Sequence, residues 1–172
     1  MAQVGQPVIE QLRDVSQCSS HLAIRDGRDI IYIARVSAAG SRINQVSIGT
    51  RLPVHCTSLG RMLLTDISRA EFEQLFPHER LGNTPGSFTT AKPCGRWCSR
   101  TKPADRSANP SSATASSIVY PVYDRSGRVA AVVSILVPRR RSQTDRERLQ
   151  TRFASRRIKF GFRVPVTGQL NQ

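Results

Sequence analysis

The sequence lacks a hydrophobic segment long enough to cross a membrane. Its longest apolar run, VAAVVSILV, covers residues 129–137, whereas a membrane helix needs about 20 residues. No apolar segment follows Met1, as a secretory signal would require. We therefore expect a cytoplasmic protein with no membrane contact, in which the four cysteines are reduced thiols.

Acidic residues are also scarce, with 12 Asp plus Glu against 26 Lys plus Arg and a formal net charge of +14. The excess is uneven: residues 1–90 contain nine Arg and eight acidic residues, whereas residues 138–159 contain nine basic and two acidic residues. Basic proteins often bind nucleic acid. Because the charge gathers where helix and strand patterns are weakest, direct nucleic-acid binding is kept as an alternative function and not as the first.

Complete metal and catalytic motifs are missing as well. Cys94 and Cys98 have a zinc-like spacing, but zinc takes four ligands and no second pair of Cys or His has such a spacing. His55 and Cys56 would point to opposite faces as neighbours on a strand, which argues against a thiol–imidazole pair. We therefore predict no metal and no cofactor.

A nucleophile elbow of the form G-x-S-x-G is only half present. Ser58 and Gly60 fit it, but Cys56 stands where the first glycine belongs. The only later histidine, His78, lies in an expected loop, so a catalytic triad has no convincing base. We predict that the chain is not an enzyme, and we keep a small hydrolase or thiol enzyme as a rival hypothesis.

The sequence does contain a clear succession of helices and strands. Apolar residues at helical spacing predict a helix over residues 7–17, and residues 21–36 predict two strands joined by a turn at Asp26-Gly27. A third strand is expected over residues 43–49. Two further strands within residues 117–138 are expected to be joined by a turn at residues 124–127. Ser68 and Glu71 have capping-box spacing and predict another helix start.

The stretch RLPVHCTSLGRMLL, residues 51–64, predicts a corner from a strand into a helix capped by Thr57 or Ser58. Backbone N–H groups of the first helical turn lack helical partners and lie at the positive end of the helix dipole. A carboxylate can bind there. An ordinary capped helix without a ligand explains the same residues. The sequence is compatible with both hypotheses, the carboxylate site and the capped helix alone.

Three stretches carry a family resemblance, namely HLAIRDGRDIIYIARV, VSIGTRLPVHCTSLGRMLL and SIVYPVYDRSGRVAAVVSILVP. In this order they resemble the effector-binding domain of IclR-type bacterial transcription regulators. The resemblance implies an α/β, GAF-like fold with a curved, mainly antiparallel sheet flanked by helices over residues 1–150, followed by a basic tail over 151–172. It implies a small organic-acid or aromatic effector and a homodimer or homotetramer. DNA binding would belong to an N-terminal winged helix-turn-helix that we expect to be absent from this truncated chain.

The resemblance also assigns a ligand pocket to Ser58, Leu59, Gly60, Ser117 and Ser134. The first three would offer backbone amides to a carboxylate, and the two later serines would be inward polar positions. A second inward polar position falls on Leu136, and an acidic residue expected near Ser107 is missing. These departures favour a less polar ligand or a site that no longer works.

Residues 91–116 match the family poorly and are rich in Ser, Thr, Pro and Ala, so taken alone they are expected to be disordered. We also weigh a shifted reading frame. GC-rich codons for PSSATAS, residues 110–116, read from their third nucleotide as Glu-Leu-Gly-Tyr-Gly-Leu, which is close to the family pattern. Sequencing the coding DNA decides this hypothesis, and a non-functional, pseudogene-like fragment is a further alternative.

Overall fold

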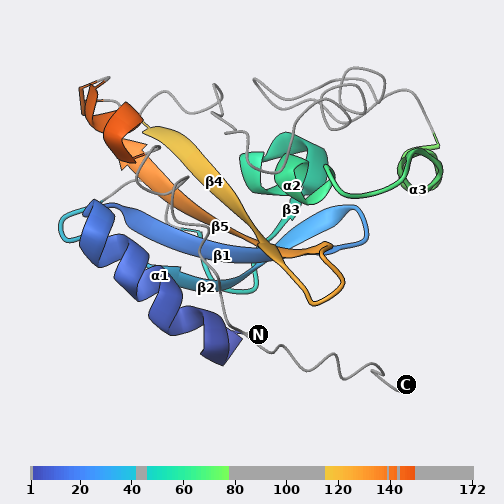
Figure 1. The fold of residues 1–172 in the computed structure, drawn as a ribbon, viewed down its shortest axis with the longest axis horizontal. Coiled ribbons are helices and arrows are strands. Elements are labelled where there is room, and N and C mark those ends of the chain that lie inside the picture. The colour runs from blue at the N-terminus through green and yellow to red at the C-terminus, as the bar shows by residue number, and fades with distance from the viewer. Residues whose placement is uncertain (1, 42–45, 78–114, 139, 143, 150–172) are drawn as a thin grey trace.

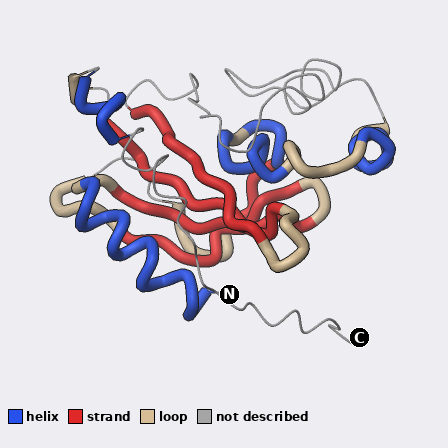
Figure 2. The backbone as a smooth tube through the Cα atoms, viewed as in Figure 1, coloured by secondary structure: helices blue, strands red, loops and turns tan. Residues whose placement is uncertain are grey.

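A five-stranded antiparallel sheet in the order β3-β2-β1-β5-β4 forms the middle of the structure (Figures 1 and 2). The computed structural model describes residues 2–41, 46–77, 115–138, 140–142 and 144–149. The strands are β1 Ser19–Asp26, β2 Asp29–Val36, β3 Arg51–Pro53, β4 Ala115–Tyr123 and β5 Val129–Pro138. The open, mixed α/β arrangement confirms the predicted fold class.

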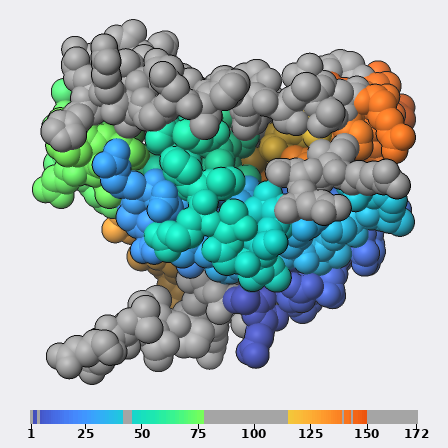
Figure 3. Space-filling model, turned by 180° about the vertical axis from the view of Figure 1, so that it is seen from behind, coloured from blue at the N-terminus to red at the C-terminus, as the bar shows by residue number. Residues whose placement is uncertain are grey.

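Helices lie on both faces of this sheet (Figure 1). They are α1 Ala2–Ser16 on one face, and α2 Ser58–Leu63 on the other, followed by α3 Arg69–Leu75. A short 3-10 helix, η1 Val54–Cys56, leads into α2, and residues 144–149 form a further helical turn. Seen from behind, α3 in green and the 144–149 segment in orange lie at opposite ends of the molecule (Figure 3). The helix α1 begins at Ala2, earlier than the predicted residue 7, and Pro7 lies inside it.

Local turn chemistry fixes both hairpins where the sequence predicts them. Gly27 follows Asp26 with φ +58°, and Gly127 closes the β4–β5 turn with φ +82°, backbone conformations that favour glycine. The Asp124 carboxylate accepts hydrogen bonds from the backbone N–H groups of Ser126 at 2.8 Å and Arg128 at 3.0 Å. These short-range interactions confirm the two predicted turns.

The third strand lies later than predicted. Residues 46–49 form no strand, and Gly49 has φ +86° and donates its N–H to the Tyr32 carbonyl at 2.8 Å. The chain therefore turns before it reaches the sheet, and β3 pairs Arg51 with Ile31 and Leu52 with Ile30. The strand prediction is wrong over residues 46–49, because it followed apolar residues and overlooked the turn. Residues 43–45 of the predicted strand lie outside the described part of the chain.

A β-bulge interrupts the pairing of β1 with β2. Leu22 lies opposite Ala34, but the next residue, Ala23, lies opposite Tyr32, so Ile33 is an extra residue in β2. Bulges of this kind are common next to functional sites. In this sheet Ile33 and Ala34 both pack against the α1 side.

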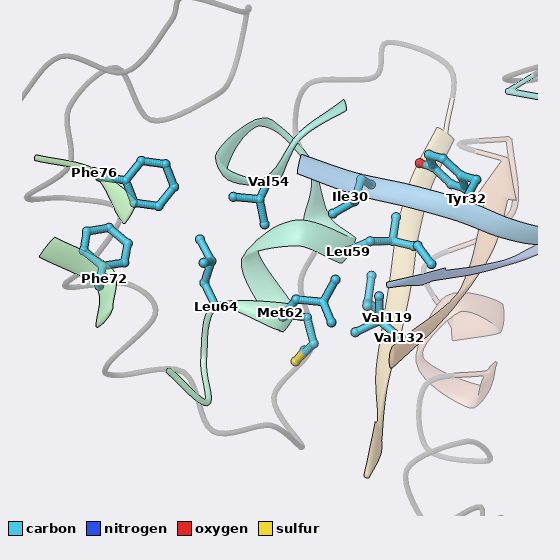
Figure 4. Packing of buried hydrophobic residues seen from close by; sticks show 12 residues of the cluster. Ile30, Tyr32, Val54, Leu59, Met62, Leu64, Phe72, Phe76, Val119 and Val132 are labelled. Carbon is cyan, nitrogen blue, oxygen red and sulfur yellow. The ribbon is translucent and has the colours of Figure 1, made fainter. Parts of the chain in front are cut away.

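Two hydrophobic clusters, one on each side of the sheet, form the core. The cluster with α1 contains Ile9, Leu12, Leu22, Val133 and Ile135. The cluster with α2 is drawn in Figure 4, where Leu59 and Met62 lie between the Phe72–Phe76 pair and strand residues Tyr32, Val119 and Val132. We call the side of the sheet that bears Ala23, Tyr32, Val119 and Val132 the α2 side.

Within the described ranges, no helix is both long enough and apolar enough to cross a membrane. Of the poorly matching stretch, residues 91–114 lie outside the described part of the chain. Ala115 and Ser116 belong to β4, so this strand begins two residues before the predicted segment that starts at Ser117.

Candidate functional site

The corner before α2 is a capped helix start. Thr57 is the N-cap, and its hydroxyl oxygen accepts a hydrogen bond from the Gly60 backbone N–H at 2.9 Å. Ser58 is therefore the first helical residue and not the cap. Because the Gly60 amide is already used, the corner amides with no partner among the described residues are those of Ser58 and Leu59.

Gly60 is needed for close packing. A Cβ built on Gly60 would lie 2.6 Å from the Cα of Val54. Real Cβ atoms do not approach other heavy atoms this closely. The helix therefore rests directly on the backbone of η1. This contact gives Gly60 a structural reason to be there that is independent of any ligand.

The geometry corrects the expectation for His55 and Cys56. They lie in a 3-10 helix and not on a strand, so their side chains meet, with 3.2 Å between Cys56 Sγ and His55 Nε2. The buried His55 ring also packs edge-on against Phe76, with 6.1 Å between ring centroids. No group of three or more metal-binding side chains occurs in the part of the chain that is described; Cys94 and Cys98 lie outside it.

Ser117 and Ser134 lie on the α2 side, on the neighbouring strands β4 and β5. Strand alternation places Ser134 beside Val132, and Ser117 beside Val119, on this side of the sheet. Ser134 pairs with Val119 and Ser117 pairs with Leu136, so the two serines are diagonal neighbours. The serines lie close to α2, because Leu59 packs in one cluster with Val119 and Val132.

The α2 side is thus divided into an apolar and a polar half. Ala23 and Tyr32 belong to the apolar half, which Leu59 of α2 covers. In the other half, Arg35 on β2, His21 on β1 and Ser134 on β5 lie opposite one another across adjacent strands. We call Arg35, His21 and Ser134 the polar row. Such a face suits a ligand that has one apolar and one polar end.

His21 is a member of this face that the sequence interpretation missed. Its side chain is 2% exposed, its Nδ1 lies 3.5 Å from Ser134 Oγ, and its ring meets Tyr32 edge-on with 5.7 Å between centroids. Burial, followed by the charge of Arg35, lowers the pKa of His21 to about 4, so the imidazole is neutral at physiological pH. His21 lies two residues before Ala23 on β1, so strand alternation would have placed it on the α2 side once the side that Ala23 faces was known.

Three polar atoms on or beside this face have no partner in the described part of the chain, although each is buried. They are His21 Nε2, Arg35 Nε and Ser58 Oγ. Arg35 does donate from Nη1 to the Val46 carbonyl at 2.9 Å. Buried polar groups are nearly always hydrogen-bonded, so the face has unused hydrogen-bonding capacity.

The sequence model of the family described as bacterial transcriptional regulator IclR C-terminal matches residues 1–156. The chain belongs to this family. The match confirms the resemblance inferred from the corner and the two hairpins. The IclR C-terminal family contains C-terminal domains of regulators, and the chain spans about half the length of the curated relatives it matches.

Among these relatives, the Pca regulon regulatory protein of Pseudomonas putida is 29% identical over 143 residues, which cover 76% of this chain and 46% of that protein. A solved IclR homolog from Microbacterium hydrocarbonoxydans, complexed with 4-hydroxybenzoate, has a TM-score of 0.73 at 24% identity, covering 89% of this chain and 64% of that one. The inducer-binding domain of a PobR double mutant from Acinetobacter, complexed with 3-hydroxybenzoic acid, has a TM-score of 0.69 at 21% identity, covering 90% and 95%. The structural likenesses establish the fold.

Proposed function

We propose that this chain is the effector-binding domain of an IclR-type transcriptional regulator, and that its effector is an aromatic acid of the hydroxybenzoate class. The observation that carries the proposal is the divided α2 side, with buried apolar residues beside the polar row. An aromatic ring matches the apolar side chains in chemical character, and polar substituents match the polar row. The hydroxybenzoates bound to two similar structures support this ligand class.

The site binds and does not catalyse. The backbone amides of Ser58 and Leu59, which have no partner among the described residues, would receive the carboxylate. Leu59 would also cover one face of the ring, and Ser134, with Ser117 beside it, would hydrogen-bond a polar substituent. Gly60 allows this corner to pack but offers no free amide.

The proposed output is a shift between two arrangements of a homodimer or homotetramer. An effector shifts such an equilibrium only through a difference in its affinity for the two arrangements. DNA binding would then change through a winged helix-turn-helix that is not part of the C-terminal domain. The basic residues of this chain are not required for this mechanism.

Calorimetric titration of the full chain with benzoate, 3-hydroxybenzoate and 4-hydroxybenzoate tests the proposal. We expect binding of at least one of these acids, and a loss of about tenfold or more in affinity for Ser134→Ala. Ser20→Ala is the matched control, because Ser20 is equally buried on the same strand as His21 but faces the α1 side.

Two results would contradict the proposal. The first is the absence of binding for all three acids at millimolar concentration. The second is an equal loss of affinity for Ser20→Ala and Ser134→Ala, since this would show a general effect of buried serines and no ligand on the α2 side.

A further inference from the structure

His21 is a buried imidazole of which the described structure uses only one nitrogen. Nδ1 faces Ser134 Oγ at 3.5 Å, the outer limit of a hydrogen bond, whereas Nε2 is buried without a partner among the described residues. Tyr32 holds the ring from the side by an edge-on contact. The orientation of the imidazole is therefore supported by packing, and Nε2 is available to hydrogen-bond a ligand.

The position of His21 connects this nitrogen with the proposed site. His21 alternates with Ala23, which packs in the α2 cluster, and it pairs across the sheet with Ser134 and Arg35. All three side chains of the polar row thus leave the sheet on the α2 side. The proposed site also contains Leu59, so a ligand whose ring packs against Leu59 would have its polar end near this row.

The neighbours of His21 decide which chemical group it suits. The facing groups from the adjacent strands are the Arg35 guanidinium, the Tyr32 ring and the Ser134 hydroxyl, and none is a carboxylate. Burial and the nearby cation both favour the neutral ring. A neutral imidazole is a poor counter-ion for a carboxylate but a good partner for a neutral hydroxyl.

We propose that His21 is a specificity-determining residue, whose Nε2 hydrogen-bonds the ring hydroxyl of a hydroxylated aromatic acid. The inference rests on the proposed function and adds which acids the site distinguishes. The Ser134 hydroxyl makes either direction of the bond available. When it donates to Nδ1, Nε2 carries the hydrogen and donates to the ligand, and when it accepts from Nδ1, Nε2 accepts from the ligand.

The test compares the affinities of benzoate, 3-hydroxybenzoate and 4-hydroxybenzoate for the full chain and for variants of His21. In the wild type we expect one hydroxybenzoate to bind about tenfold or more tightly than benzoate, because an unpaired buried nitrogen penalises the ligand without the hydroxyl. His21→Phe should reduce this ratio to about one, because it removes the nitrogen that a ligand without the hydroxyl leaves unpaired.

Matched amides provide a second comparison that does not depend on the folding of His21→Phe. His21→Gln places a polar atom near the position of Nε2, whereas His21→Asn places one only near Nδ1. We expect Gln to keep most of the preference and Asn to lose it. Circular dichroism of each variant verifies that it is folded.

The outcomes separate the two proposals. Equal wild-type affinities for benzoate and both hydroxybenzoates, or a preference that persists in His21→Phe and His21→Asn, would overturn the role of His21 and leave the aromatic-acid site standing. No binding of any of the three acids to the wild type would overturn the proposed function, and the role of His21 with it.

Discussion

At the scale of single residues, burial controls the charge of His21. An ordinary histidine has a pKa near 6.5, and burial, reinforced by Arg35, lowers that of His21 to about 4. The unfolded chain therefore binds a proton in a pH range where the folded chain does not. Stability from this group is complete above the unfolded pKa and is lost as the pH falls from about 6.5 towards 4.

We expect the free energy of unfolding to fall by roughly 2 kcal/mol between pH 7 and pH 5 because of His21. Urea denaturation at the two pH values measures this change. The same pair of measurements on His21→Asn should show a smaller fall. An equal fall in wild type and variant would assign the pH dependence to other groups.

Gly60 leads to a second prediction at this scale. In an ordinary helix a change from Gly to Ala stabilises by up to about 1 kcal/mol, but here the added methyl would meet the backbone of Val54. We expect Gly60→Ala to destabilise the fold by about 2 kcal/mol, in the range of overpacking, as measured by the shift of the urea midpoint.

Gly127→Ala is the comparison for Gly60→Ala. Gly127 has φ +82° with no atom close to an added Cβ, so its cost is conformational and about 1 kcal/mol. A stabilised Gly60→Ala would show that α2 does not rest on η1 as the structure has it.

At the scale of elements, the capping of α2 sets the position of the candidate site. The Thr57 side chain accepts from the Gly60 N–H, and loss of such a cap costs about 1 kcal/mol. We expect Thr57→Ala to lose this amount in denaturation experiments and to weaken effector binding, whereas Thr57→Ser, which keeps the hydroxyl, should behave like the wild type. A Thr57→Ala variant of unchanged stability would contradict the assigned cap.

The same scale shows what can be predicted from the sequence. The Asp26-Gly27 turn, the turn that ends at Gly127 and the Ser68 cap of α3 depend on neighbours within a few residues, and the structure confirms them. The capping box itself is only half formed: Ser68 Oγ accepts from the Glu71 N–H, but the Glu71 carboxylate pairs with Arg25 of β1 at 2.7 Å.

Non-local features could not be predicted in this way. The place of β3 depends on the register between residues far apart in the chain, and His21 joins the candidate site only through pairing with Ser134, which lies 113 positions away. The sequence alone presents His21 as one of three scattered histidines. The sequence likewise predicts that the His55 and Cys56 side chains point to opposite faces, which is wrong because a 3-10 helix forms there in place of a strand.

At the scale of the whole molecule, the sheet separates a structural side from a proposed binding side. Ile9 of α1 is fully buried on one side, and Leu59 of α2 is buried on the other. Truncation of either side chain removes core contacts, which typically costs about 2–5 kcal/mol.

We expect Ile9→Ala and Leu59→Ala to have comparable effects on stability but different effects on binding. Titration with the preferred aromatic acid, under conditions in which both variants are folded, should show near wild-type affinity for Ile9→Ala and a loss of about tenfold or more for Leu59→Ala. Equal losses would mean that the two sides are not separate in function.

The extra residue in β2 has a consequence for how this chain compares with its relatives. Before Ile33, even-numbered side chains of β2 point to α2; after it, odd-numbered ones do, which is how Tyr32 and Arg35 come to share a side. A relative that lacked this one residue would still present both groups, with an arginine that follows the tyrosine by two positions in place of three. Numbers of intervening residues are therefore an unsafe guide to the polar row, and its members are better found by their partners across the sheet.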